Sequence, residues 1–221
     1  MHSYQNLETL SNLYRLKALG FNYIDPIVLN TPTINQTLPN NIDRLNDTIA
    51  SCHLCDLAKS CTNRQSGFGS IDAKVIFVDT HPILDNKNPN SYYSSKTGVM
   101  LKNMIEGVLK LTVNDVFVTF LAKCKPLGFN TPSNDEYHSC LAYLLKQIEL
   151  IEPKIVVSLG EIPYQFLTND TNSDFNSIRG EVITFLNTNL IAMHHPIFLS
   201  HNPSQKRDAM RDLSIIKGVI G

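Results

Sequence analysis

Three short, predominantly apolar runs constrain the fold of this chain more than any other feature of its sequence. They cover residues 74–79 (KVIFVD), 115–122 (DVFVTFLA) and 154–159 (KIVVSL), and they are rich in β-branched and aromatic side chains. A strand with one wet face alternates apolar and polar residues, whereas a strand buried on both faces does not. The runs therefore predict inner strands of a sheet that is covered on both sides.

Helical patterns separate these strand-like runs. Residues 98–111 repeat apolar side chains at helical spacing. Ser133 followed by Glu136 is a capping-box pattern ahead of a helix that ends near residue 151. Strands that alternate with helices predict a three-layer α/β/α fold around a central, mostly parallel sheet.

The predicted topology also indicates where a functional site would lie. Two further short strands are expected at 181–186 and 190–193. In open α/β sheets, ligands bind beyond the carboxyl ends of the strands. The loops that follow Asp79, Ala122 and Met193 are therefore the predicted location of a site.

Composition and charge limit the class of protein. Of 221 residues, 43% are hydrophobic and 18% charged, which is typical of a globular chain, and no apolar run is long enough to span a membrane. Residues 1–10 are polar and lack the apolar core of a signal peptide, so a cytoplasmic location is expected. The net charge of −1 does not indicate a polyanionic partner, so nucleic-acid binding would need a local basic patch.

The chain divides into two parts by composition. Residues 3–19 show an amphipathic helical pattern, and the polar stretch 30–41 that follows contains two prolines. We expect residues 1–45 to form an N-terminal helical extension and linker, and residues 46–221 to form one domain. A monomer is expected.

Five cysteines are compatible with a metal centre. Cys52 and Cys55 form a C-x-x-C pair, and Cys124 and Cys140 lie further along the chain. Disulfides are not expected in a cytoplasmic protein, whereas four thiolates suit either a tetrahedral zinc ion or a cubane iron–sulfur cluster. Buried thiols without a metal are the alternative, and Cys61, which has no partner at such spacing, is expected to be one.

Several motifs occur in an order that is characteristic of one family. They are the Cys52 and Cys55 pair with Gly67 and Gly69, Lys123-Cys124-Lys125-Pro126, Thr131-Pro132, the strand 153–160, Arg179-Gly180, and a C-terminal group from His195-Pro196 to Asp212-Leu213. In these motifs, over about residues 46–217, the chain resembles the family 4 uracil-DNA glycosylases of the uracil-DNA glycosylase superfamily.

The resemblance implies a cofactor and a reaction. It implies a [4Fe–4S] cluster on Cys52, Cys55, Cys124 and Cys140, with zinc as the second candidate. It also implies hydrolysis of the N-glycosidic bond of deoxyuridine, or of a related damaged nucleotide, in base excision repair after the base is flipped out of DNA. His195 would stabilise the negative charge that develops on uracil O2.

The resemblance further implies a DNA-binding segment near the C-terminus. The loop 196–203 would enter the minor groove, with Leu199 as a wedge that fills the gap left by the flipped base. Asn202 belongs to the same motif, and Lys206 and Arg207 would hold phosphates. The expected partner is DNA that contains uracil or a damaged base.

The loop after the first strand departs from the family pattern. Family 4 has Gly-Glu-Gly/Ala-Pro-Gly there, whereas this chain has Asp-Thr-His-Pro-Ile. Pro82 is kept, Thr80 replaces the acidic residue, and both are expected to line the base pocket. We expect Asp79 or Asp85 to supply the carboxylate, and His81 to orient or deprotonate the water.

The base pocket departs as well. Phe120 stands where the family has an asparagine whose amide pairs with the uracil edge, and a phenyl ring cannot make those hydrogen bonds. Tyr93 is expected to be the aromatic residue that stacks on the base.

Three functions follow as hypotheses. The first is a DNA glycosylase for uracil or a related damaged base. The second is a catalytically impaired iron–sulfur protein that binds DNA and keeps the glycosylase fold. The third is a zinc-stabilised interaction module. Thr80 and Phe120 favour the second over the first, while the His195-Pro196 motif favours contact with DNA in both.

Overall fold

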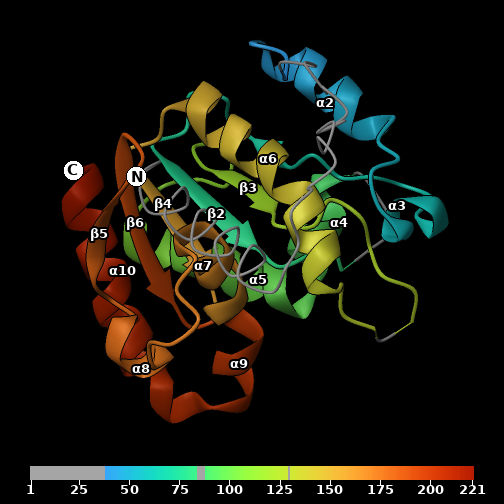
Figure 1. Cartoon of the computed structure of the whole chain (residues 1–221). Helices are drawn as coiled ribbons and strands as arrows, with labels where there is room; N and C mark the ends of the chain where they lie inside the picture. The colour runs from blue at the N-terminus through green and yellow to red at the C-terminus, as the bar shows by residue number, and fades with distance from the viewer. Residues whose placement is uncertain (1–37, 84–87, 129) are drawn as a thin grey trace, which may run out of the picture. The chain divides into compact units, whose positions relative to one another are not determined.

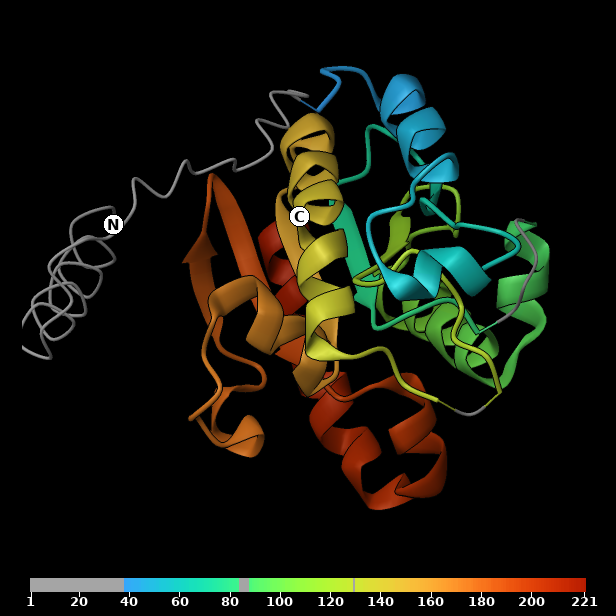
Figure 2. The same ribbon diagram turned by 45° about the vertical axis from the view of Figure 1, so that its right-hand side comes forward.

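The computed structural model describes residues 38–83, 88–128 and 130–221, which are drawn in colour in Figures 1 and 2. They form a six-stranded sheet of order β1-β3-β2-β4-β6-β5 with helices on both faces. The four inner strands are parallel, and the edge strands β1 and β5 are antiparallel. The strands are β1 Phe68–Gly69, β2 Val75–Asp79, β3 Phe117–Phe120, β4 Ile155–Leu159, β5 Val182–Phe185 and β6 Thr188–Met193. The predicted α/β/α fold is confirmed.

The predominantly apolar runs are explained by burial on both faces of the sheet. All five residues of β2 are buried. Val75 and Phe77 belong to the core on one face, and Ile76 and Val78 to the core on the other. Successive strand residues point to opposite faces, so both sets must be apolar when helices cover both.

The helices are divided between the two faces. Helices α5, α9 and α10, with a π-helical turn η1, pack on one face, and α3, α6 and α7 pack on the other. Within the described ranges, no helix is both long and apolar enough to cross a membrane. The helices are α2 Ile42–Ala50, α3 Asp56–Ser60, α4 Pro89–Ser94, α5 Lys96–Met104, η1 Ile105–Leu109, α6 Asn134–Ile151, α7 Glu161–Thr168, α8 Phe175–Ile178, α9 Pro196–His201, the 3-10 turn η2 Pro203–Gln205 and α10 Lys206–Ile220.

Helix α6 shows the predicted capping box. The Ser133 hydroxyl accepts a hydrogen bond from the Glu136 N–H at 3.3 Å, and the Glu136 carboxylate accepts one from the Ser133 N–H at 2.7 Å. The helix predicted at 98–111 begins slightly earlier, because Ser95 caps α5 by accepting from the Gly98 N–H at 3.0 Å. A side chain at Gly98 would collide with the backbone of Tyr92, so glycine allows α4 and α5 to meet closely.

The predicted domain boundary at residues 45 and 46 falls inside helix α2. Leu45 and Ile49 are both fully buried and pack against Tyr143 of α6. The compact unit that the structure describes therefore begins at Leu38. The amphipathic helix expected at residues 3–19 lies outside the described residues.

A buried ion pair ties the last helix to the edge of the sheet. Arg179, which follows α8, binds both carboxylate oxygens of Asp212 in α10 at 2.8 and 2.9 Å and also contacts Asp208. The adjoining Gly180 N–H donates to Ala192 of β6 at 2.9 Å. The side chains of Arg179 and Asp212 are 7% and 1% exposed, so neither charge has water as an alternative partner.

Arg179→Ala should therefore destabilise the fold strongly. Removing the guanidinium leaves the Asp212 carboxylate buried without its cation, which costs roughly 3–5 kcal/mol of unfolding free energy. Arg211→Ala is the matched control, because it removes an exposed partner of Asp208 and should cost less than about 1 kcal/mol. Urea denaturation measures both, and equal losses would contradict an anchoring role for Arg179.

Candidate active site at the carboxyl edge of the sheet

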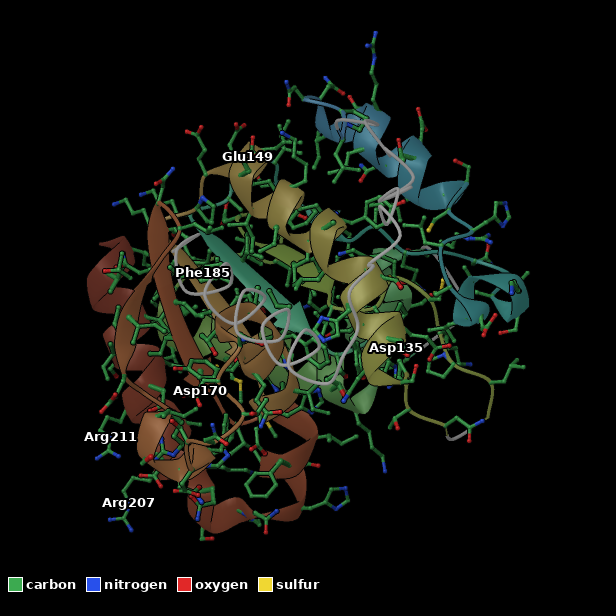
Figure 3. The ribbon with its side chains drawn as sticks, in the orientation of Figure 1. Asp135, Glu149, Asp170, Phe185, Arg207 and Arg211 are labelled. Carbon is green, nitrogen blue, oxygen red and sulfur yellow. The ribbon has the colours of Figure 1, made fainter. Side chains whose placement is uncertain are left out.

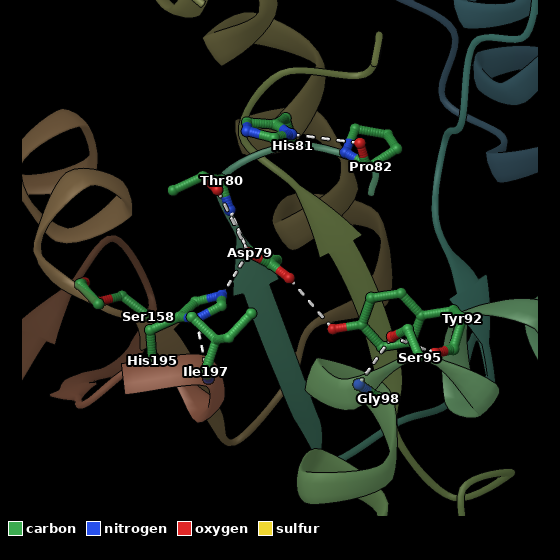
Figure 4. A network of polar contacts seen from close by, with 11 residues as sticks. Asp79, Thr80, His81, Pro82, Tyr92, Ser95, Gly98, Ser158, His195 and Ile197 are labelled. Carbon is green, nitrogen blue, oxygen red and sulfur yellow. Dashed lines mark hydrogen bonds and ion pairs between the residues drawn. The ribbon is translucent and has the colours of Figure 1, made fainter. Parts of the chain in front are cut away.

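The loops after two inner strands meet at the carboxyl edge of the sheet, as predicted. Asp79 is the last residue of β2, and His195 lies two residues beyond the end of β6. Their side chains meet, with His195 Nε2 3.0 Å from Asp79 Oδ1, although 116 residues separate them in sequence (Figure 4). Between them in the sheet, β4 ends at Leu159, and the Gly160 that follows has a φ of 95°, a backbone conformation that favours glycine, and lies next to the Cβ of His195.

Every oxygen of the Asp79 carboxylate has a partner inside the protein. Oδ1 accepts from the Thr80 N–H at 2.7 Å and from His195, and Oδ2 accepts from the Tyr92 hydroxyl at 3.1 Å. Asp79 is 1% exposed. Burial raises the pKa of this carboxyl, but the nearby His195 and the three hydrogen bonds outweigh it and hold the pKa below its usual value. Asp79 is therefore ionised at neutral pH.

His195 is held from both sides of its ring. Its Nδ1 accepts from the Ile197 N–H at 3.2 Å, which makes His195 the cap of helix α9, so the proton of the neutral ring lies on Nε2 and points to Asp79. Burial lowers the pKa of His195, while the charge and hydrogen bond of Asp79 raise it, and the net pKa lies above its usual value. Both ring nitrogens of His195 are therefore hydrogen-bonded to other groups of the protein.

The rings of Phe68, Tyr92, Tyr93 and Phe120 form an aromatic wall next to the Asp79–His195 pair. The centroid of the Phe68 ring in β1 lies 5.2 Å from that of Tyr92 and 5.6 Å from that of Tyr93. The ring centroids of Tyr92 and Phe120 are 6.0 Å apart. Phe120 is fully buried among these rings and offers no hydrogen bond to a base. The buried Tyr93 hydroxyl has no hydrogen-bond partner among the described residues, and burial raises its pKa, so it remains a neutral donor.

Three other residues predicted for the site follow Asp79 in the loop after β2. Thr80 stays beside Asp79, with its hydroxyl 3.4 Å from Oδ1, and Pro82 is buried. His81 donates its Nδ1–H to the Pro82 carbonyl at 3.2 Å, on the opposite side of Thr80 from His195 in Figure 4. Asp85 lies outside the described residues. Sequence reasoning did not assign Tyr92 its bond to Asp79, for which the only signal was its place in the Tyr-Tyr pair ahead of Gly98.

The predicted wedge residue does not have the position expected of it. Residues 196–201 form helix α9 rather than an open loop, because His195 caps it and Pro196 suits its first turn. This helix turns Leu199 into the core, where it is fully buried and cannot reach a base step. The apolar side chains that α9 exposes are Ile197 and Phe198, each 41% exposed.

The side chain of Phe198 is held by a neighbouring ring. Its ring stacks on the buried ring of His194, with centroids 4.7 Å apart and planes 24° apart. The Asn202 side chain donates to the Phe198 carbonyl at 3.0 Å and so closes the same helix. Lys206 and Arg207 begin α10 and are exposed, and Figure 3 shows Arg207 extending away from the ribbon.

The four predicted metal ligands come from three parts of the fold. Cys52 and Cys55 lie between α2 and α3, Cys124 follows β3, and Cys140 lies in α6. Burial raises the pKa of Cys55, Cys124 and Cys140, and in each case a neighbouring thiol adds to the rise. Cys61 is also buried, beside Cys124 in the same core. Across residues 38–83, 88–128 and 130–221, no three His, Cys, Asp or Glu side chains converge as for a single metal ion.

An α/β fold with an Asp–His pair at the carboxyl edge of a parallel sheet is compatible with a site that binds a ligand at that edge. The chain belongs to the Uracil DNA glycosylase superfamily, whose family model matches residues 66–215.

Relatives within this superfamily are similar over most of their length. A type-4 uracil-DNA glycosylase from Archaeoglobus fulgidus is 29% identical over 188 residues, which are 82% of this chain and 94% of that protein. The type-4 enzyme of Saccharolobus solfataricus is 29% identical, over 80% of this chain and 86% of its own. That of Thermotoga maritima is 26% identical, over 80% and 93%. The predicted family is confirmed.

The Asp79–His195 pair can be tested by titration. Asp79→Asn removes the charge that raises the pKa of His195 and leaves the burial that lowers it, so that pKa should fall. Tyr92→Phe is the matched control, because it removes a donor from the other carboxylate oxygen and should leave that pKa unchanged or raise it. Proton NMR of the His195 ring measures both variants, and a fall of the same size in both would contradict the pairing.

The raised pKa of His195 makes the free energy of unfolding depend on pH. Because the folded-state pKa of His195 is raised, its stabilising contribution is complete below the unfolded pKa and is lost as pH rises through the folded pKa.

Proposed function

We propose that the protein removes uracil, or a related damaged base, from DNA by hydrolysing the N-glycosidic bond in base excision repair. The observation that carries this proposal is the ionised Asp79 beside His195 at the carboxyl edge of the sheet. Membership of the superfamily supports the same chemistry. The target base would be flipped out of the stack before reaction.

Asp79 and His195 each have a role in this reaction. The Asp79 carboxylate would stabilise the positive charge that develops on the sugar, or accept a proton from the attacking water. The Nε2–H of His195 would donate to the oxygen of the departing base, where negative charge develops. In the resting site that proton is directed to Asp79, so the leaving base must displace the carboxylate from it. We therefore expect slow catalysis.

Recognition of the base would rest mainly on stacking. Phe120 offers no hydrogen bond, and the Tyr93 hydroxyl is the buried donor of the aromatic wall that has no partner among the described residues. A site with one donor discriminates among bases less sharply than a site that pairs with a whole edge. We expect activity on several altered bases, with uracil among them.

The DNA contact would lie on α9 and the start of α10. Phe198 replaces Leu199 as the proposed wedge, because it is exposed and its ring is supported by His194. Lys206 and Arg207 are exposed cations close by in the chain and would bind phosphates. We further propose that the protein acts as a monomer in the cytoplasm.

A second candidate function is DNA binding without cleavage. It is favoured by one observation, that both nitrogens of His195 and both oxygens of Asp79 are already hydrogen-bonded inside the protein. Such a site is stable as it stands and gains little by turning toward a substrate.

The thiols favour an iron–sulfur cluster over a single zinc ion. Cys52 adds to the rise in the pKa of Cys55, both add to that of Cys140, and Cys140 adds to that of Cys124, as expected if the four thiols form one ligand set for a [4Fe–4S] cluster. In a cluster each thiolate binds a different iron, so the four sulfurs need not converge on one point. Bound there, the cluster would supply structural links between α2, α3, the β3 loop and α6. The reaction proposed above uses none of its electrons.

Single-turnover cleavage of a labelled uracil oligonucleotide at saturating protein tests the proposed function. The parent should produce abasic DNA slowly, and His195→Ala should reduce the rate by about a hundredfold or more, as for loss of one oxyanion donor. Phe120→Asn should raise the preference for uracil over normal pyrimidines, because it adds an amide to the aromatic wall.

Two outcomes would contradict parts of this proposal. If the parent yields no abasic product from single- or double-stranded DNA, the binding-only function replaces it. If the parent cleaves and His195→Ala is as fast, the site does not act through His195.

The cluster is tested by iron analysis of protein purified without oxygen. The parent should be brown and contain iron and sulfide, and Cys124→Ala should lose both. Cys61→Ala is the matched control, since it removes a neighbouring buried thiol outside the proposed ligand set and should keep the iron. A colourless parent with one zinc per chain would overturn the cluster.

A further inference from the structure

A buried lysine lies immediately before one of the proposed metal ligands. Lys123 is 2% exposed. Its ammonium donates to Thr119 Oγ1 at 2.8 Å, and to the Phe120 carbonyl and Gln147 Oε1 at 2.7 Å each. All three acceptors are neutral, and no carboxylate among the described residues forms an ion pair with this ammonium.

Arg64 is a second cation of the same region. Its Nη2 donates to the Ala58 carbonyl at 2.7 Å, and its Nε is buried with no hydrogen-bond partner in the part of the chain that the structure describes. Nor does any carboxylate of that part pair with its guanidinium. The two cations lie on segments that are joined directly, because the Gln65 N–H donates to the Lys123 carbonyl at 2.7 Å.

Both cations act on thiols of the proposed ligand set. Burial raises the pKa of Cys140, whereas a hydrogen bond from the Lys123 backbone N–H and the charge of the Lys123 ammonium lower it. Burial and neighbouring thiols raise the pKa of Cys124, and the charge of Arg64 opposes that rise. A cation that lowers the pKa of a thiol stabilises the thiolate, which is the form that binds a metal.

The two cations need a counter-charge. A buried charge without a partner is strongly unfavourable, so buried cations are normally paired with an anion. Four thiolates carry more negative charge than the oxidised core of a [4Fe–4S] cluster carries positive charge, so the bound cluster is a net anion. It would supply the counter-charge that the described side chains do not. The inaccessibility of Arg64 Nε to solvent suits a buried cofactor rather than a ligand at the surface.

We propose that Arg64 and Lys123 are positioning residues of the cofactor site, whose charges balance the thiolate-bound cluster and raise its reduction potential. The role assigned to them rests on the cluster proposed above. Reduction by one electron adds a negative charge to the cluster, so a nearby buried cation stabilises the reduced form more than the oxidised form. Net charge and hydrogen bonds to the sulfurs are among the features by which proteins set such potentials.

Voltammetry of the full chain, purified without oxygen and adsorbed on an electrode, tests this role. It gives the midpoint potential of the cluster, and iron and sulfide are measured on the same samples. Arg64→Gln removes the cation and keeps a polar side chain, so its midpoint potential should be more negative than that of the parent. Lys123→Met removes the ammonium from a chain of similar length and should shift the potential in the same direction. Arg64→Lys keeps the charge and should return the potential toward that of the parent.

Lys59→Gln is the matched control. Asp56, and to a lesser extent the proposed ligand Cys55, raise the pKa of Lys59, so this cation also lies near the thiols. Its side chain is 72% exposed, and its Nζ lies 2.6 Å from the Asp56 carboxylate. Water and Asp56 screen its charge, so removing it should leave the potential close to that of the parent.

The outcomes separate this role from the cluster itself. Equal shifts in Arg64→Gln and Lys59→Gln, or an unchanged potential, overturn the role of Arg64 and leave the cluster standing, and an unchanged potential in Lys123→Met does the same for Lys123. If Arg64→Gln holds no iron, Arg64→Lys decides: iron at the level of the parent supports the counter-charge, and its loss overturns it. A parent without iron overturns both the counter-charge and the cluster.

Discussion

The buried carboxylate of Asp79 is the interaction on which the candidate site depends. It joins three elements at once, because Tyr92 of α4, the start of the loop after β2, and His195 at the head of α9 all donate to it. A buried charge without these donors would be strongly unfavourable, so the three elements are held in one arrangement. His195 in turn caps α9, which places the position of the exposed Phe198 under the same control.

Helices α9 and α10 form one lobe of the structure. A second buried charge pair, Arg179 and Asp212, holds α10 in this lobe. Arg179 and Asp212 attach α10 to the segment that enters β5, and the last helix also packs along one face of the sheet. The lobe that carries Phe198, Lys206 and Arg207 is thus held by these polar contacts in addition to the packing of Leu199 and Leu213 in the core on one face of the sheet. Such a construction suits a surface that must keep its shape while it exposes apolar and cationic groups.

Local features of the fold were predictable from the sequence, and several features of the site were not. The apolar runs, the capping box of α6 and the final helix follow from local periods and caps, which neighbouring residues decide. The motif predicts Leu199 on the DNA surface only if its segment is a loop. His195 and Pro196 start a helix there, and helical geometry then turns Leu199 into the core. The bond between Tyr92 and Asp79 has no local signal, because it depends on how α4 meets the end of β2.

The sequence by itself determined the class of fold, the edge of the sheet at which a site would form, and the family, because these depend on patterns carried by short segments. Only the tertiary structure decided that Asp79 and His195, 116 residues apart, form a pair that satisfies both side chains internally. It also decided that Phe120 belongs to an aromatic wall in which the Tyr93 hydroxyl is buried without a hydrogen-bond partner among the described residues. The physical reason is that strand order and register bring distant residues together, and neither is recorded in the spacing of residues along the chain.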